Sequence, residues 1–198
     1  HNAACPENPD FSMGYVWPVY DTYDVFASNL DGSDLRQLTT EDGYDAEATF
    51  SPIGDRIVFT SARDGDLELY SMAPDGSDLL RLTDRPGYDG GAFYSPDGSK
   101  IIWRAYYPEE GPELEDYRRL LSQGLLRPGE LEIYIMDADG SNQQQVTQLG
   151  GANFAPYWHP SGEKILFSSN HHDPDGRDFE IYMINIDGGG LTRITYAE

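Results

Sequence analysis

The stretch SPDGSKIIW, from Ser95 to Trp103, occurs in three related forms in this chain. The other two are SPIGDRIVF, residues 51–59, and HPSGEKILF, residues 159–167. In each of them a proline and a glycine precede a short run of apolar residues. Proline cannot continue the hydrogen bonding of a strand and glycine suits a tight turn, so the phrase predicts a corner that leads into a β-strand. His159 stands where the other forms have serine, and we expect it to replace that serine locally.

A second phrase accompanies the first. It reads DGSDLRQLT from Asp31, DGSDLLRLT from Asp75, DGSNQQQVT from Asp139 and DGGGLTRIT from Asp187. Each of the first three aspartates lies 20 residues before the next Ser-Pro or His-Pro corner. Asp-Gly pairs suit hairpin turns, and the segments between the phrases have the apolar alternation of strands. Each repeat therefore predicts four antiparallel strands, and such a unit recurring about every 44 residues is typical of propeller blades.

The predicted fold is an all-β propeller of about four blades, each a four-stranded antiparallel sheet. The blades are expected at about 8–40, 43–84, 87–148 and 150–195 of one propeller domain, complete or incomplete. The first blade is expected to lack its inner strand, with the segment YVWPVY, from Tyr15 to Tyr20, as its second strand. We expect unpaired strand edges at both ends of this set of blades.

The third blade carries an irregular insertion at 107–129. Pro112 suits the first turn of a helix, the acidic residues after it suit the positive end of the helix dipole, and Gly124 suits the exit. The insertion therefore predicts a short helix over the mouth of the propeller channel, which serves either as a plain lid or as a docking surface. Its apolar residues at helical spacing are Leu114, Tyr117, Leu120 and Leu121.

These phrases resemble the TolB-type propeller repeat, which has a Ser-Pro-Asp-Gly corner, an Ile-Tyr-x-Met strand, an Asp-Gly-Ser turn and a final Leu-Thr. The segment IYIMDADGSNQQQVT, from Ile133 to Thr147, is the nearest match. The resemblance covers nearly the whole chain outside the first dozen residues and the insertion. It implies a propeller fold and an exported protein, located in the periplasm or outside the cell. It implies little about function, because one fold serves many functions.

The composition limits the classes of partner. The formal net charge is −22, and such a surface repels nucleic-acid phosphate and acidic lipid headgroups. It suits cations, basic partners or simple solubility. The longest apolar runs have four to six residues, so no membrane span is predicted. The single cysteine, Cys5, excludes a disulfide within the chain.

No cofactor and no catalytic residue is predicted. The chain has no Gly-x-Ser-x-Gly elbow and no phosphate-binding loop. The segments DPDGRD (173–178) and DGDLE (64–68) place carboxylates at alternate positions, as calcium loops do, but neither has the full twelve-residue pattern. Calcium therefore stays an open alternative. No zinc site is predicted, because the adjacent His171 and His172 have no third ligand at a suitable spacing.

Candidate ligand-binding residues lie where the variable loops and the crossings between blades meet, because function prefers variable loops on a rigid scaffold. Glycines at 90 and 91 leave space beside polar side chains there. This arrangement predicts either a polar ligand pocket or a solvated channel. The candidate ligand-binding residues are Asp45, Glu47, Asp89, Arg104, Asn153, His171 and His172.

Two functions fit the sequence. The favoured one is a non-enzymatic exported binding or assembly protein, with a ligand or protein partner at the loops and self-association into a homo-oligomer through exposed strand edges. The alternative is an enzyme, or the accessory domain of an enzyme, that acts on a polar or saccharide-like ligand in the propeller funnel.

Overall fold

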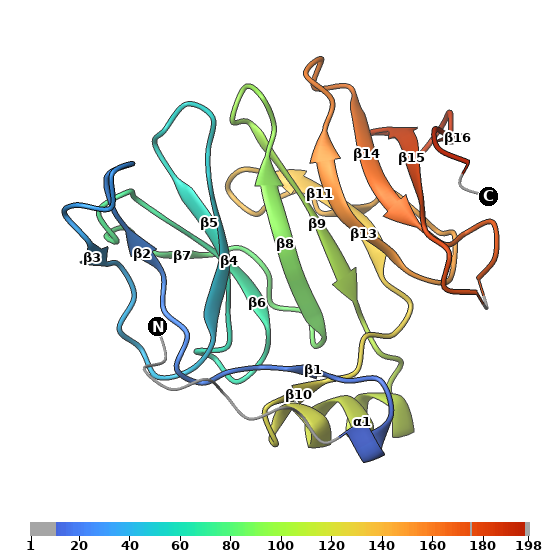
Figure 1. Ribbon diagram of the computed structural model, residues 1–198, viewed down its shortest axis with the longest axis horizontal. Coiled ribbons are helices and arrows are strands. Elements are labelled where there is room, and N and C mark those ends of the chain that lie inside the picture. Colours follow the sequence, from blue (N-terminus) through green and yellow to red (C-terminus); the bar gives the residue numbers. More distant parts are fainter. Residues whose placement is uncertain (1–10, 175, 197–198) are drawn as a thin grey trace.

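Three four-stranded antiparallel sheets stand side by side in the computed structural model, which describes residues 11–174 and 176–196 (Figure 1). We name them blades two, three and four. Blade two consists of β4 (Asp45–Phe50), β5 (Ile57–Ser61), β6 (Glu68–Met72) and β7 (Leu80–Arg81). Blade three consists of β8 (Tyr88–Tyr94), β9 (Lys100–Tyr106), β11 (Glu132–Asp137) and β12 (Gln144–Gln145). Blade four consists of β13 (Asn153–Trp158), β14 (Lys164–Ser169), β15 (Glu180–Asn185) and β16 (Thr192–Arg193).

Within each blade the strands pair in chain order, from the inner strand (β4, β8 or β13) outward. The predicted all-β fold of four-stranded antiparallel blades is confirmed. The turns between first and second strands lie at the upper end of the molecule in Figure 1, which we call the turn end. The crossings between blades and the insertion lie at the opposite end, the loop end. The scaffold thus gathers its irregular segments on one side.

The repeated Asp-Gly-Ser phrase folds the same way in successive blades. The carboxylate of Asp75 accepts the Ser77 backbone N–H at 3.0 Å and the serine hydroxyl at 2.6 Å. The glycine between them has a φ of 87°, which is a left-handed conformation that glycine adopts without strain. Asp139 and Ser141 repeat these bonds in blade three. The phrase is therefore a structural hairpin turn.

Apolar side chains fill the spaces between adjacent blades. Trp103 of β9 is fully buried and packs in one cluster with Val58 and Leu69 of blade two. The neighbouring Ile102 belongs to the cluster on the other side, together with Phe167 of blade four. Since successive side chains of a strand point to opposite faces, blade three buries both of its faces. This packing holds the blades as rigid neighbours.

The first blade is shorter than expected within the described residues. It comprises β2 (Phe26–Ala27) and β3 (Arg36–Gln37), which pair with each other. The expectation that YVWPVY supplies its second strand is wrong. Within that segment β1 (Trp17–Pro18) pairs with β10 (Leu125–Leu126) of the insertion. Residues 8–10 of the expected blade lie outside the described residues.

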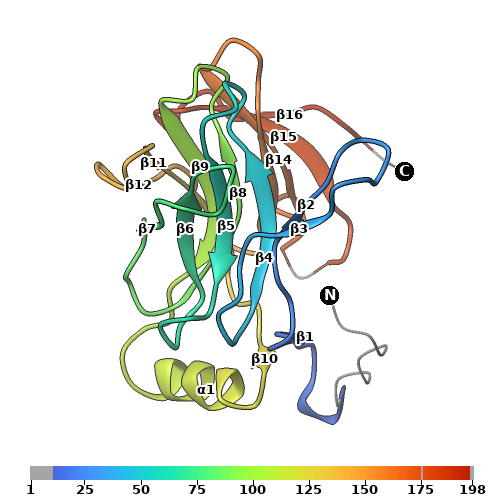
Figure 2. The same cartoon turned by 90° about the vertical axis from the view of Figure 1, so that its left-hand side faces the viewer.

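The insertion forms the predicted helix. Helix α1 (Pro112–Leu121) lies at the loop end, as both views show (Figures 1 and 2), and the short helix η1 (Phe11–Met13) precedes β1. Tyr117 is buried on the face of α1 that packs with Leu67 and Tyr88. Its hydroxyl donates to the carbonyl of Gly87 at 2.5 Å. The helix therefore covers the crossing between blades two and three. No helix among the described residues is long and apolar enough to cross a membrane.

Each inner strand contains an irregularity that its sequence does not reveal. The pairing register shifts within β4, β8 and β13. The residues at the equivalent positions, Glu47, Gly91 and Ala155, have φ values of 57°, 60° and 51°. A bulge re-aims the side chains next to it. In β4 it turns Glu47 toward the neighbouring blade.

Candidate functional site

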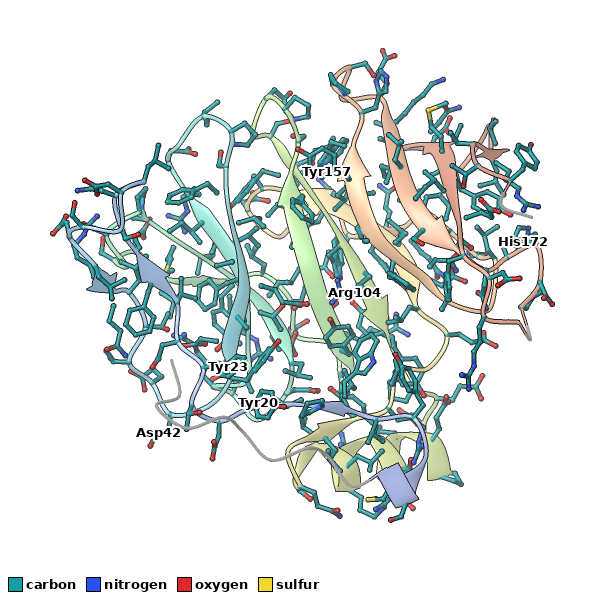
Figure 3. All side chains as sticks on the ribbon, in the orientation of Figure 1. Tyr20, Tyr23, Asp42, Arg104, Tyr157 and His172 are labelled. Atoms are coloured by element: carbon teal, nitrogen blue, oxygen red, sulfur yellow. The ribbon has the colours of Figure 1, made fainter. Side chains whose placement is uncertain are left out.

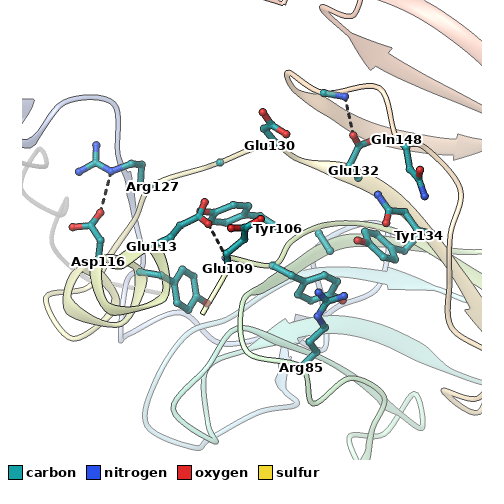
Figure 4. Close-up of a pocket in the computed structure, with 16 residues that line it drawn as sticks. Arg85, Tyr106, Glu109, Glu113, Asp116, Arg127, Glu130, Glu132, Tyr134 and Gln148 are labelled. Atoms are coloured by element: carbon teal, nitrogen blue, oxygen red, sulfur yellow. Dashed lines mark hydrogen bonds and ion pairs between the residues drawn. The ribbon is translucent and has the colours of Figure 1, made fainter. Parts of the chain in front are cut away.

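A hollow of about 990 Å³ lies at the loop end between the insertion and blade three (Figure 4). Tyr106 and Tyr107 enter it where β9 ends, and Glu113 enters it from the first turn of α1. Its other main contributors are Arg85, Glu109, Asp116, Arg127, Glu130, Glu132, Tyr134, Gln145 and Gln148. Only the third blade carries the insertion, so this hollow is not a general feature of the repeat.

Aromatic rings and one guanidinium form the floor of the hollow. The Arg85 guanidinium carbon lies 4.0 Å from the centre of the Tyr107 ring, within the range of a cation–π interaction. Tyr107 and Tyr134 meet edge to face, with ring centres 5.2 Å apart. The Tyr107 hydroxyl donates to Asp89 Oδ1 at 2.6 Å, so the ring is held in place from below. Burial raises the pKa of Tyr107, which keeps this hydroxyl protonated.

Carboxylates dominate the walls. Glu113 accepts the Tyr106 hydroxyl at 2.5 Å and the Glu109 backbone N–H at 2.7 Å. Asp116 lies 3.4 Å from Arg127. The side chains of Glu109 and Glu130 are exposed and have no cationic partner among the described residues. Five carboxylates face two guanidiniums, so the hollow attracts cations, and its tyrosines offer faces on which a cation or an apolar stem can lie.

Two of the seven residues singled out from the sequence come together. Glu47 of β4 and Arg104 of β9 form an ion pair at 2.5 Å between Oε1 and Nη2. Arg104 also donates to the Tyr88 hydroxyl at 2.6 Å, and Glu47 Oε2 accepts the Gly91 N–H at 2.9 Å. The bulges in β4 and β8 make this cluster possible. Its groups bind each other and join blades two and three.

Asp45, Asp89 and Asn153 are 2%, 0% and 0% exposed, so they lie inside the scaffold. Asp45 forms a bidentate ion pair with Arg63, with both N–O distances 3.0 Å. Asn153 donates its amide to the Leu131 carbonyl at 3.0 Å. Each of these residues binds other protein groups at the boundary between two blades.

Asp89 differs from Asp45 because no cation among the described residues neutralises it. Its Oδ1 accepts the indole N–H of Trp103 and the hydroxyl of Tyr107, both at 2.6 Å. Complete burial raises its pKa to about 8, and the nearby Glu68 acts in the same direction. Burial without a cationic partner disfavours the ionised form of this carboxyl group.

The two histidines lie apart from the other candidates. Figure 3 shows Arg104 near the middle of the molecule and His172 at the outer side of blade four. His171 Nδ1 lies 3.1 Å from the Leu149 carbonyl, and His172 packs near the Tyr182 ring. None of the seven candidates lines the hollow, and their role as ligand-binding residues stays a prediction.

The sequence pointed to the hollow only through the insertion. Arg85, Tyr134 and Gln145 occupy regular positions of the repeat and carry no irregular pattern of their own. A single cation in the crossing before Gly87 and two adjacent tyrosines before the insertion were the available signals. Among the described residues no group of three or more His, Cys, Asp or Glu side chains could hold a metal ion. Asp175, in one of the two candidate calcium loops, lies outside them.

Comparison with known proteins agrees with the geometry. Residues 15–110 match the family described as the TolB beta propeller domain. An uncharacterized protein of Agrobacterium fabrum is 27% identical over 86 residues, which are 41% of this chain and 29% of that protein. The chain thus spans well under half of this relative.

Solved structures show the same fold. A candidate TolB of Agrobacterium tumefaciens has a TM-score of 0.65 at 23% identity over 91% of this chain and 61% of its own. TolB of Acinetobacter baumannii has a TM-score of 0.69 at 18% identity over 91% of this chain and 41% of its own. Hydrazine synthase of Kuenenia stuttgartiensis has a TM-score of 0.63 at 19% identity over 82% and 27%. The chain therefore spans less than two thirds of each of these structures.

Proposed function

The chain is built from the repeats of the TolB-like β-propeller family, and from this premise we propose that it is a non-enzymatic binding and scaffold protein. The partner binds at the loop end, in the hollow between the insertion and blade three. The observation that carries this proposal is the insertion itself. It is the one long departure from the repeat, and it borders a space lined by tyrosines and carboxylates, of which Glu109 and Glu130 have no cationic partner among the described residues.

The partner is a polypeptide segment that carries lysine or arginine. The exposed Glu109 and Glu130 have no cationic partner in the part of the chain that the structure describes, while Tyr106 and Tyr134 offer ring faces beside them. A protein with a formal charge of −22 attracts a basic segment from a distance. Once the segment is seated, the lysine stem can lie along a tyrosine ring with its ammonium group toward the carboxylates.

Binding of a short peptide of alternating lysine and glycine, measured by calorimetry at low ionic strength, tests this proposal. Glu109→Gln combined with Glu130→Gln is expected to weaken binding roughly 2- to 30-fold, because each exposed ion pair contributes about 0.2–1 kcal/mol. Added salt should weaken binding by the wild-type protein more than binding by the double variant.

Asp55→Asn combined with Glu163→Gln is the matched control, because it removes two exposed carboxylates at the turn end. Equal weakening by the two pairs of substitutions would show that the peptide senses only the overall charge, and the hollow would then not be the site. A thermal shift with a neutral saccharide, and none with the peptide, would favour the alternative of an enzyme or an accessory domain of an enzyme.

We also propose self-association and export as parts of this function. The strand β16 has only two residues, so the sheet face of blade four is a larger surface for association than its edge. Ile181 and Ile194 are 37% and 45% exposed on that face, where a second copy of the chain can bury them. The family resemblance supports a location in the periplasm or outside the cell.

A further inference from the structure

The most informative buried group outside the hollow is a pair of carboxyls at the boundary between blades two and three. Asp89 is 0% exposed and Glu68 is 1% exposed. Asp89 Oδ2 and Glu68 Oε2 are both buried side-chain oxygens without a hydrogen-bond partner. Unsatisfied buried polar atoms are rare in folded proteins, and each one calls for an explanation.

The repeat supplies a direct comparison at the next boundary. The Asp89 N–H donates to the Leu67 carbonyl at 2.9 Å, and the Asn153 N–H donates to the Leu131 carbonyl at 3.0 Å. Glu68 directly follows the first carbonyl and Glu132 follows the second. Asp89 and Asn153 therefore occupy the same place relative to an acidic residue of the preceding blade.

At the boundary between blades three and four, an amide satisfies the acid. Asn153 Nδ2 donates to Glu132 Oε2 at 3.2 Å, and Thr147 Oγ1 donates to the same oxygen at 2.5 Å. An aspartate has no proton to donate unless it is protonated, so Asp89 can replace the amide only as a carboxylic acid. Burial raises the pKa of both Asp89 and Glu68, and a hydrogen bond from Thr83 opposes this rise in each of them. The Thr83 hydroxyl has a single proton, so it cannot satisfy both orphaned oxygens.

We propose that Asp89 is held as a neutral carboxylic acid that donates to Glu68 across the blade boundary, and that its ionisation loosens this boundary. The two carboxyls then form a pH-sensitive latch between blades two and three. Asp45 shows the contrasting solution at the preceding boundary, where Arg63 neutralises the equivalent carboxylate. The latch lies next to the proposed binding hollow, because Tyr107 donates to Asp89 and also lines the hollow.

Within residues 11–174 and 176–196, the other ionisable groups around the pair do not supply a neutralising cation for Asp89. Arg81 of β7 donates to Glu68 Oε1 at 2.9 Å and Arg85 lies over Tyr107. From the remaining elements the neighbours are hydroxyl groups or acids. They are Tyr107 after β9, Tyr117 of α1, Tyr134 of β11 and Asp66 before β6.

The sign of the pH dependence follows from linkage. In the unfolded or locally opened chain the Asp89 carboxyl has an ordinary pKa of 3.8, and in the closed boundary its pKa is about 8. Between these values the closed state binds one proton more than the open state. The closed state is therefore most favoured at a pH below the lower pKa. The equilibrium constant for opening then rises by up to roughly tenfold per pH unit until the pH passes the upper pKa.

Hydrogen exchange of two equivalent amides tests the proposal. The protection factor of the Asp89 N–H in the wild-type chain is expected to fall as the pH rises from 5 to 8, while that of the Asn153 N–H stays nearly constant. Asp89→Asn should abolish the fall at the first boundary. Asn153→Asp should create one at the second boundary, where Glu132 then faces an acid.

Infrared difference spectroscopy gives a readout that does not depend on the folding of the variants. The wild-type chain at pH 7 should show the C=O stretch of a protonated carboxylic acid, and this band should disappear above pH 9 or in Asp89→Asn. Absence of the band at pH 7 would overturn the proposal. Parallel pH profiles of the two amides in the wild-type chain would overturn it as well.

Discussion

At the scale of single residues, the final threonine of each repeat explains the Leu-Thr phrase. Thr147 Oγ1 accepts the Ile133 N–H at 2.8 Å and donates to Glu132 Oε2 at 2.5 Å. Thr83 accepts the equivalent N–H of Leu69 at 2.8 Å. Thr39 and Thr195 repeat this bond in the first and last blades. One hydroxyl thus satisfies a backbone donor and an acid in the interior of the fold.

Replacing Thr147 by valine removes both bonds at nearly constant volume. The Ile133 N–H is then buried without its acceptor, and we expect the free energy of unfolding to fall by roughly 1–3 kcal/mol. Chemical denaturation monitored by tryptophan fluorescence measures this loss. Thr147→Ser keeps the hydroxyl and should retain most of the stability, so equal stability of the two variants would contradict the assigned role.

The corner residues show how far a sequence pattern carries at this scale. His159 Nδ1 lies 2.9 Å from Ser161 Oγ, and at the equivalent corner Ser95 Oγ donates to Asp97 at 2.6 Å. His159 thus replaces the corner serine locally, as expected from its position in the repeat. The hydrogen bonds of Ser95 and Ser99 lower the pKa of Asp97 to about 2, so this carboxylate stays ionised over the usual pH range.

At the scale of elements, the bulges of β4 and β8 join blade two to blade three. A Cβ atom on Gly91 would lie 1.9 Å from Arg104 Nη1, because the bulge brings the backbone against the guanidinium. The Arg104 side chain in turn binds Glu47. Gly91 is therefore required both for its φ of 60° and for the close approach.

Gly91→Ala is expected to destabilise the fold by at least roughly 1–3 kcal/mol from backbone strain alone, and by more if Arg104 is displaced. Ala155→Gly is the matched control, because Ala155 has the same left-handed backbone at the equivalent position of β13 and is exposed. This control should leave stability nearly unchanged or raise it slightly. Thermal unfolding of both variants is the measurement, and a loss in Ala155→Gly as large as that in Gly91→Ala would contradict the argument.

Elements that depend on neighbouring residues could be predicted, and elements that depend on distant residues could not. The blades, their hairpin turns and helix α1 follow from phrases that lie within a few dozen residues of one another. The pairing of β1 with β10 joins segments that are separated in the sequence by the first two blades, and no local pattern encodes it. The bulges could not be predicted, because glutamate and alanine, which stand at positions 47 and 155, rarely adopt a positive φ.

The candidate site was predicted less well for a related reason. Periodicity shows which side chains share the loop end, but it does not show which of them bind each other. Asp45 and Glu47 were predicted to lie at that end with free carboxylates, yet arginines of the same scaffold neutralise both of them. The hollow needed the three-dimensional path of the insertion before Arg85 and Tyr134 could be associated with it.

At the scale of the whole molecule, blade four exposes a face that the other blades cover. Val25, Leu69, Ile133 and Ile181 are equivalent, since a threonine hydroxyl accepts the backbone N–H of each. Their exposures are 7%, 0%, 0% and 37%. The first three pack against the following blade. Ile181 has no following blade among the described residues, and under the function proposed above a second copy of the chain covers this face.

Ile181→Ser combined with Ile194→Ser should therefore lower the average particle mass of concentrated samples in light scattering. Leu35→Ser is the control, because Leu35 is an exposed apolar residue of the first blade, 68% exposed. A monomeric mass for the wild-type chain at every concentration would contradict self-association. So would an equal effect of the control substitution.

The ribbon of β1 and β10 has a consequence for biosynthesis. The Val19 N–H donates to Gly124 O at 2.7 Å, and Arg127 Nη1 donates to Met13 O at 2.9 Å across 114 positions of the chain. On the ribosome, the segment before the first blade therefore emerges long before its partner residues, Gly124 and Arg127, have been translated. Such long-range closure is slow compared with the folding of hairpins. The nascent chain therefore carries this segment unpaired until residues 124–127 have been translated.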